Sequence, residues 1–297
     1  MKVTATMVRE LRERTGIGMM ECKRFLVEAD GDMERAIELL RKSGQGRADK
    51  KAGRVAAEGM IAAETDGKDG YALVEVNCET DFVARSDQFQ GFSKAVAQAV
   101  LRDAPADLMA VSELVIDGGT VESVRSDIVG KIGENVRVRR FERVSLKGDV
   151  ASVYLHGGRI GVLVDMSGGD EGLARDVAMH IAASRPLCVS EHDMPAEVLD
   201  KEKEVLAAQA EEQVKSDGKP PEIAEKMVQG RVRKFLSEVT LLGQPFVKDP
   251  DQSVGKLLKS RNATVNTFYR FEVGEGIEKK QENFAEEVEA QVKAAEA

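Results

Sequence analysis

The sequence predicts an α+β protein in which a small helical unit precedes a duplicated core of helices on antiparallel sheets. Three observations support this class. Apolar residues recur at helical spacing near the N-terminus, two strand-like hairpins are each followed by a helix, and two further helical segments flank the turn SDGKPP. We expect a three-helix domain (1–45), a linker (46–54), a first core subdomain (55–145), a second core subdomain (146–186 and 240–273), a helical-hairpin, coiled-coil insertion (187–239) and a C-terminal module (274–297).

The first 45 residues contain three short amphipathic segments. The first helix is expected to end at Gly16, the second at the turn 30–31 and the third at Gly44. Helices this short are marginal alone, so they should pack as one bundle. The stretch 44–53, which carries Gly and Lys, predicts a tether after the bundle.

From residue 55 onward, apolar residues alternate with polar ones, as in a strand, and no longer recur at helical spacing. The first half is expected to contain strands at 55–64 and 71–78, a helix from 89 to near 105, a helix at 121–132 and a strand at 135–144. The second half predicts strands at 151–155 and 160–166, a helix ending before 186, and the segment 255–272, whose RFE ending echoes that of 130–142. Hairpin, helix, later helix and strand follow in the same order in both halves, which indicates duplication.

Two helices interrupt the second copy. Residues 195–215 and 222–239 predict an antiparallel helical hairpin. Because its apolar residues are sparse, we expect a thin arm that projects from the core, with an ordinary pair of core helices as the alternative. A last, acidic helix is expected over 281–297.

The composition argues against several classes of protein. Of 297 residues, 32% are charged, and 43 Lys and Arg against 52 Asp and Glu give a net charge of −9. Proteins that bind nucleic acids gain affinity by neutralising phosphates with basic residues, so no direct nucleic-acid partner is expected. The N-terminus lacks the apolar stretch of a signal peptide, and no run is long enough to span a membrane. We expect a cytoplasmic protein without a membrane partner.

No residue pattern predicts a catalytic, cofactor or metal site, and we expect a protein that is not an enzyme. A phosphate-binding loop is lacking, and HGGRIG falls in a hairpin turn. His156, His180 and His192 are scattered, and no cysteine pair accompanies them. Cys78 ends an apolar strand and is expected to be a small buried hydrophobe, with a Cys–His nucleophile as the alternative.

Other residues favour an interaction function. Met19 and Met20 are adjacent and cannot share one helix face, so one is expected in the core and the other free for a partner. The alternative is that both are packed internally. In EVNCETDFVAR (75–85), the polar ETD ends a strand and Phe82 follows directly after Asp81. A loop Phe usually folds back onto the core; the alternative is an exposed anchor beside a carboxylate.

At these residues the chain resembles bacterial elongation factor Ts, the nucleotide exchange factor for elongation factor Tu. The resemblance is carried, in family order, by LRERTGIGMMECK (11–23), EVNCETDFVAR (75–85), KIGEN (131–135), HGGRIGVLV (156–164), PPEIAEKMVQGR (220–231), GQPFV (243–247) and RFEVGEGIEK (270–279). Two positions depart from the family pattern. Phe25 stands where a small residue is usual, and Lys248 stands where an apolar residue is expected.

The resemblance implies a ubiquitin-associated-like fold for the N-terminal bundle and elongation factor Tu, GDP-bound or nucleotide-free, as partner. By this resemblance Arg12, Met19 and Met20 would contact the partner's GTPase domain, Asp81 and Phe82 would enter beside its Mg²⁺-binding region, Ile132 and Gly133 would support that surface, and His156 and Val247 would contact another domain. From the residues alone, His156 is a hairpin-turn residue with a local hydrogen bond. The alternative function is a non-catalytic adaptor that binds through the bundle; self-association through the helical hairpin is left open.

Overall fold

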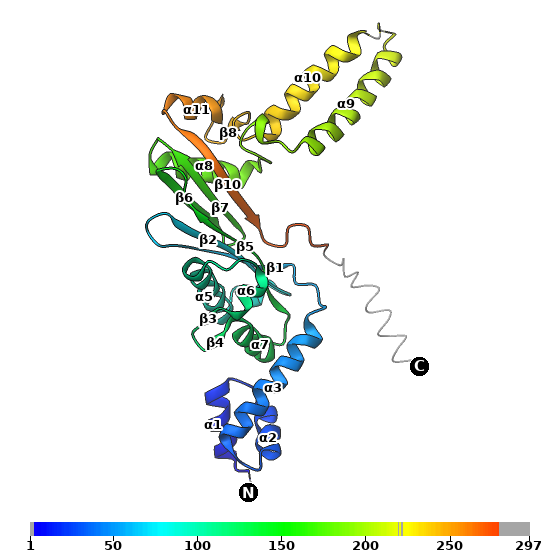
Figure 1. Ribbon diagram of the computed structural model, residues 1–297. Coiled ribbons are helices and arrows are strands. Elements are labelled where there is room, and N and C mark those ends of the chain that lie inside the picture. Colours follow the sequence, from blue (N-terminus) through cyan, green and yellow to red (C-terminus); the bar gives the residue numbers. More distant parts are fainter. Residues whose placement is uncertain (1–2, 219, 221, 279–297) are drawn as a thin grey trace, which may run out of the picture. The chain divides into compact units, whose positions relative to one another are not determined.

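The computed structural model describes residues 3–218, 220 and 222–278, and it combines helices with small sheets (Figure 1). The chain is therefore α+β, as predicted. The described residues of 1–64, 74–141 and 272–297 form one compact unit, and those of 65–73 and 142–271 form another. The predicted helix at 281–297 lies outside the described residues. The predicted domain boundaries stay predictions.

The first three helices are α1 (Ala5–Thr15), α2 (Met19–Glu28) and α3 (Met33–Lys51), and they pack on one another (Figure 1). Thr4 caps α1, with the Met7 N–H donating to the Thr4 hydroxyl oxygen, and Gly16 ends it at a φ of +70°. The side chains that form their shared core are Leu11, Cys22, Phe25, Leu26, Ala29, Ala36 and Leu40. Phe25, which stands where a small residue is usual in the family, is thus buried inside the bundle.

The third helix is longer than predicted. It continues past Gly44 to Lys51, so the expected helix end at Gly44 and the non-helical tether over 44–51 are wrong. A glycine inside a helix costs only about 1 kcal/mol relative to alanine, whereas each added residue of an existing helix gains a hydrogen bond. Contacts of α3 with α7 (Val121–Ile132) add tertiary support.

The first three-stranded sheet has the order β1-β2-β5. Its strands are β1 (Glu58–Thr65), β2 (Gly70–Cys78) and β5 (Val136–Ser145), and the elements between β2 and β5 are α4 (Asp81–Ala84), α5 (Asp87–Asp103), α6 (Leu108–Glu113), β3 (Val115–Ile116), β4 (Gly119–Thr120) and α7. The predicted strands and helices of the first half are all present, with ends shifted by a few residues. β2 is the central strand, and its side chains from Ala72 to Cys78 are buried.

The second three-stranded sheet has the order β10-β7-β6. Its strands are β6 (Val150–His156), β7 (Ile160–Ser167) and β10 (Thr264–Glu272), and the further elements are α8 (Glu171–Ser184), the 3-10 turn η1 (Glu191–Asp193), β8 (Pro245–Phe246), β9 (Asp249–Ser253) and α11 (Val254–Ser260). β6 and β7 are antiparallel, and α8 packs against both of them (Figure 1).

The two sheets share their strand order. In each, the second hairpin strand is central and the late strand pairs with its free side. A matching glycine occurs in both. A Cβ at Gly59 would collide with the carbonyl oxygen of Val76, and a Cβ at Gly148 would collide with that of Met166. These backbone approaches require glycine at both positions, and they support the expectation of a duplicated core.

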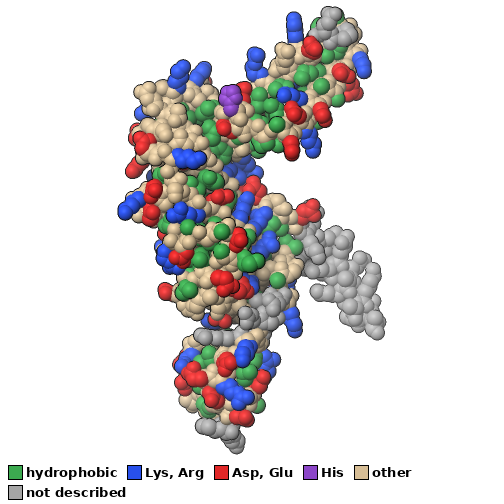
Figure 2. All heavy atoms as spheres, viewed as in Figure 1, with side chains coloured by type: hydrophobic (Ala, Val, Ile, Leu, Met, Phe, Trp, Pro, Cys, Tyr) green, Lys and Arg blue, Asp and Glu red, His purple; other side chains and the backbone are tan. Residues whose placement is uncertain are grey.

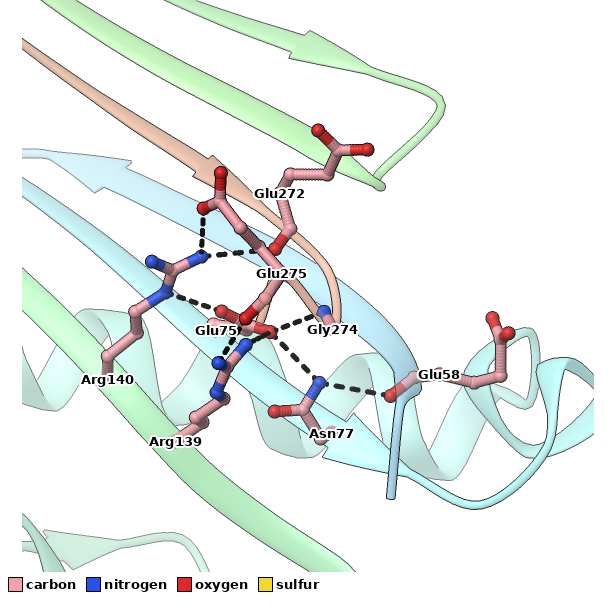
Figure 3. A network of polar contacts seen from close by, with 8 residues as sticks. All are labelled: Glu58, Glu75, Asn77, Arg139, Arg140, Glu272, Gly274 and Glu275. Atoms are coloured by element: carbon pink, nitrogen blue, oxygen red, sulfur yellow. Dashed lines mark hydrogen bonds and ion pairs between the residues drawn. The ribbon is translucent and has the colours of Figure 1, made fainter. Parts of the chain in front are cut away.

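The central strand of the first sheet carries a fully buried carboxylate, Glu75 (Figure 3). It accepts hydrogen bonds from Arg140 Nε at 2.6 Å, Arg139 Nη1 at 3.0 Å, the Gly274 N–H at 2.8 Å and Asn77 Nδ2 at 3.0 Å. Burial alone would raise the pKa of Glu75, but these four donors together outweigh it and lower the pKa. The network joins β2, β5 and the segment after β10.

Asp165 takes the corresponding place in the second sheet. It is buried in the central strand β7 and accepts from the backbone N–H groups of Lys147 (2.8 Å) and Gly148 (2.9 Å) and from Asn266 Nδ2 (3.1 Å). In both sheets the buried carboxylate directly precedes the residue whose carbonyl a glycine approaches. A buried charge is tolerated only with such donors.

The predicted helical hairpin consists of α9 (Ala196–Ser216) and α10 (Glu222–Val239), which lie side by side (Figure 1). Within α9 only Ala210 and Val214 are buried, and Val198 and Val205 are exposed. Figure 2 shows hydrophobic side chains among charged ones on this pair. Such a thin apolar contact agrees with the sparse pattern of the sequence. No helix in the described part of the chain has the length and apolar character needed to cross a membrane.

Glu75→Gln is expected to lower the free energy of unfolding by about 3 kcal/mol at pH 7, near the lower end for a broken buried ion pair, because two partly exposed guanidinium groups lose the buried carboxylate that they share. The lowered pKa of Glu75 means that its stabilisation is complete above its ordinary value of 4.5 and is lost as the pH falls through the folded-state value. The gap between wild type and variant should therefore shrink between pH 5 and pH 3 in urea titrations.

Glu38→Gln serves as the control, because the Glu38 carboxylate pairs with Lys42 on an exposed helix face. It should leave the unfolding midpoint at pH 7 unchanged. An equal and pH-independent loss in both variants would contradict the role given to Glu75.

Candidate partner-binding site

A single helical turn, α4, connects the end of β2 to α5. Thr80 is its N-cap, accepting from the Val83 N–H at 3.4 Å. Ser86 follows as the N-cap of α5, and its hydroxyl donates to the Val83 carbonyl at 2.8 Å. The turn is thus bounded by two caps, which fix its start and its end. We refer to residues 80–86 as the hook.

Phe82 projects from the hook into solvent. Its side chain is 81% exposed, while its neighbour Val83 is 8% exposed. Successive residues of a helix point about 100° apart, so burying Val83 turns Phe82 outward. Of the two positions open from the sequence, folded back onto the core or exposed, the ring is exposed, and it lies on a helical turn in place of a loop. Phe89 and Phe92, in the helix that follows, are buried.

Two glutamates hold the base of the hook by reciprocal hydrogen bonds. The Glu134 carboxylate accepts from the Thr80 N–H at 3.0 Å and from the Thr80 hydroxyl at 2.7 Å. The Glu79 carboxylate accepts from the Asn135 N–H at 2.6 Å. Each of the two segments therefore supplies a carboxylate to the backbone of the other. We call these four residues the glutamate clamp.

The C-terminal end of α3 joins the same assembly. Lys51 Nζ donates to the carbonyl of Gly133, and Arg54 forms an ion pair with Glu79 at 3.5 Å. Asn135 Nδ2 donates to the carbonyl oxygens of Arg54 (2.9 Å) and Ala52 (3.3 Å). A lysine at this carbonyl complements the negative end of α7. Three segments distant in sequence are thus tied together beneath the hook.

Asp81, beside Phe82, is half exposed. Its carboxylate pairs with Arg85 Nη2 at 2.8 Å, one helical turn along the chain. The pair lies at the surface, where such ion pairs contribute little to stability. The hook therefore presents an apolar ring next to an accessible carboxylate.

Cys78 lies directly below the hook and is fully buried, which confirms its prediction as a small buried hydrophobe. Its thiol donates to the Thr80 carbonyl oxygen at 3.1 Å. Burial, with smaller contributions from the Glu134 and Glu58 carboxylates, raises the pKa of this thiol to about 12. A thiol that stays protonated is a poor nucleophile.

Ile132 and Gly133 end α7 and lead into the clamp. Both are half-buried, and Gly133 ends the helix at a φ of +86°. The clamp thus ties the segment that carries Asp81 and Phe82 to the segment that carries Ile132 and Gly133. The structure therefore brings these four predicted residues together around the clamp.

Arg12, Met19 and Met20 are exposed on the helical bundle of the same unit. The expectation that one of the two methionines is a core residue is wrong, since Met19 is 54% and Met20 78% exposed. Both lie in the first turn of α2, and neither belongs to the apolar cluster of the bundle, which contains Leu11 with Ile17 packed against it.

The remaining two predicted residues belong to the other unit. His156 ends β6, is exposed and makes a local hydrogen bond with the Tyr154 hydroxyl at 3.1 Å. Val247 follows β8 and is 45% exposed. Among the described residues, no hydrogen bond or ion pair joins His156 to Val247.

The segments that follow the central strands of the two sheets differ at the hook. Thr80 stands five residues after the buried Glu75, and Asp170 stands five residues after the buried Asp165. Both are N-caps, but Asp170 opens the long helix α8 directly, whereas Thr80 opens the single turn α4. Among the described residues, the hook therefore follows the central strand of the first sheet and has no equivalent after that of the second.

Glu79, Glu134 and Asn135 were not among the predicted site residues. Their hydrogen bonds join positions 54 to 56 residues apart in sequence, which no local pattern specifies. The only signal was their place within the motifs EVNCETDFVAR and KIGEN. Among the described residues, no group of three or more His, Cys, Asp or Glu could hold a metal ion.

Comparison with known proteins points to one family. The model of the family described as Elongation factor TS matches residues 79–275. The chain is 59% identical to elongation factor Ts of Thioalkalivibrio sulfidiphilus (strain HL-EbGR7), over 99% of this chain and 100% of the relative. It is 58% identical to that of Alkalilimnicola ehrlichii (strain ATCC BAA-1101 / DSM 17681 / MLHE-1), with the same coverage, and 53% identical to that of Legionella pneumophila (strain Paris), over 98% and 99%.

Glu134→Ala should loosen the hook while leaving its sequence intact. It removes both acceptors of Thr80 and leaves a half-buried N–H unsatisfied, so we expect a loss of about 2 kcal/mol in the free energy of unfolding. Amide hydrogen exchange of residues 80–83 should become faster than in wild type. Glu113→Ala, at an exposed position of α6, is the control and should change neither quantity. Unaltered exchange at 80–83 would show that the clamp does not hold the hook.

Proposed function

This chain belongs to the elongation factor Ts family, and we propose that it acts in translation elongation as a guanine nucleotide exchange factor for elongation factor Tu. It would bind both the GDP-bound and the nucleotide-free partner in the cytoplasm and would itself catalyse no covalent step. The observation that carries the proposal is the exposure of Phe82 on a hook whose base is fixed by the glutamate clamp. An apolar ring held outward in this way is suited to insertion into a partner.

In the proposed mechanism, Phe82 inserts between helices of the partner beside its Mg²⁺-binding region, with Asp81 meeting a polar site there. Displacing Mg²⁺ removes the main counter-charge of the GDP diphosphate, and a shifted phosphate loop removes hydrogen bonds to it. By thermodynamic linkage, a partner that weakens GDP binding is itself bound more weakly by the GDP form. Ile132 and Gly133 support this contact from the other side of the clamp.

The energy of the insertion limits what Phe82 contributes alone. Burying one Phe side chain yields roughly 1.5–3 kcal/mol, and each 1.4 kcal/mol changes a rate tenfold. Phe82 alone would therefore increase the rate of GDP release by about one to two orders of magnitude. A larger effect requires the further contacts, which we assign to Arg12, Met19 and Met20 on the bundle and to His156 and Val247 in the second unit.

The finer architecture belongs to the same proposal. We assign a ubiquitin-associated-like bundle to the N-terminal helices, two related subdomains to the core and an arm to α9 and α10. Self-association through this arm is an additional proposal, supported by the exposed Val198 and Val205.

A second candidate function is an adaptor that binds its partner through the helical bundle without affecting nucleotides. The exposure of both Met19 and Met20 supports a contact surface there that is independent of the hook. The two functions differ in one measurable property: an adaptor binds elongation factor Tu and leaves the GDP off-rate unchanged. A hydrolase or transferase that uses Cys78 is disfavoured by the raised pKa of its buried thiol.

Phe82→Ala should slow the stimulated release of GDP by about one to two decades without abolishing it, because the bundle and second-unit contacts remain. The measurement is stopped-flow release of a fluorescent GDP from elongation factor Tu. Met109→Ala is a matched control, since Met109 is 79% exposed and lies outside the proposed contacts. Release as fast as with wild type, from a folded Phe82→Ala variant, would refute insertion of the ring.

A further inference from the structure

The loop that follows α10 contains Val247, one of the proposed contact residues, and is attached to α8 by a buried histidine. The Val247 N–H donates to Nδ1 of His180 at 3.2 Å. His180 is fully buried, although it lies 67 residues away in the sequence. Its ring also packs on Phe246, with ring centroids 5.9 Å apart. The backbone on the N-terminal side of Val247 is thus held from inside the unit.

The hydrogen bonds determine the tautomer of His180. Because a backbone N–H donates to Nδ1, this nitrogen carries no proton, and the ring proton resides on Nε2. Nε2–H then donates to Gln244 Oε1 at 3.0 Å. The amide nitrogen of Gln244 in turn donates to the carbonyl oxygens of Glu238 (2.7 Å) and Ser184 (3.2 Å). Burial lowers the pKa of His180, which keeps the ring neutral at neutral pH.

A second attachment lies on the other side of Val247. Lys248 Nζ pairs with Asp176 at 2.6 Å, and Asp176 precedes His180 by one turn of α8. Lys248, which departs from the family pattern, therefore has an ionic partner in this chain. Val247 is held between two contacts from one helix, and its side chain remains 45% exposed.

We propose that His180 is a positioning residue for partner binding: its Nδ1 holds the backbone of Val247 so that the exposed side chain meets elongation factor Tu in a single orientation. This inference rests on the proposed function, which makes Val247 a contact residue. A contact that is ordered before binding loses less conformational entropy on binding. The buried ring thereby affects affinity without touching the partner.

Two amide variants separate the two hydrogen bonds of the ring. His180→Asn places an amide oxygen near the position of Nδ1, where it can accept from the Val247 N–H. His180→Gln places an amide nitrogen near the position of Nε2, where it can donate to Gln244. Both lose the ring and its packing, and each retains one of the two hydrogen bonds, so weaker binding by His180→Gln would identify the Val247 hydrogen bond as the one that matters for the partner. We expect His180→Gln to bind nucleotide-free elongation factor Tu about fivefold more weakly than His180→Asn, the usual effect of one hydrogen bond.

The same pair is then measured with Val247→Ala added. If His180 acts through Val247, the fivefold difference should fall to less than twofold, and the Val247 amide of the free chain should exchange faster in His180→Gln than in His180→Asn. Equal affinities of the two single variants, or a difference that persists with Val247→Ala, would overturn the inference while leaving the exchange function intact. A wild-type chain that does not bind elongation factor Tu would overturn the proposed function and this inference with it. Thermal unfolding of all variants verifies that they are folded.

Discussion

The site depends on one constraint: the reciprocal hydrogen bonds by which Glu79 and Glu134 tie the end of β2 to the end of α7. A phenylalanine in solvent has a strong tendency to fold back onto apolar surface. Here the caps at Thr80 and Ser86 fix the helical turn, and the buried Val83 determines its facing. Because the base is held in this way, the backbone of the turn does not allow the Phe82 ring to point toward the core. Exposure of the ring is therefore a consequence of how polar groups below it are satisfied.

Buried carboxylates serve a comparable purpose in both sheets. Glu75 and Asp165 occupy corresponding places in the central strands, and each is surrounded by donors from segments distant in sequence. Such a group is unfavourable unless all of its partners are in place, so it favours one register and one connection over others. In the first sheet the donors include Gly274, which fixes where the chain runs after β10. The two sheets thus resemble each other in polar chemistry as well as in strand order.

The regions around the two sheets nevertheless carry different surface features. The first carries the hook, and the second has no counterpart between Ser167 and α8. The second has an exposed Val247 attached to the buried His180. Each feature places an apolar side chain in solvent on a backbone anchored by buried or half-buried polar groups. One physical solution, a rigid polar base under an apolar tip, serves both proposed contact regions.

The α+β class, nearly every helix and strand and the order in which they recur in the two halves could be predicted from the residues alone, because periodicity, caps and turns are local properties. The sequence motifs also identified the family to which the chain belongs. Three features depend on tertiary contacts and were not predictable: α3 runs through Gly44, Met19 and Met20 are both exposed, and Phe82 points outward. The glutamate clamp and the His180–Val247 contact join residues 54 to 67 positions apart. Whether an apolar side chain is buried depends on which distant segments fill the space beside it, and no local pattern contains that information.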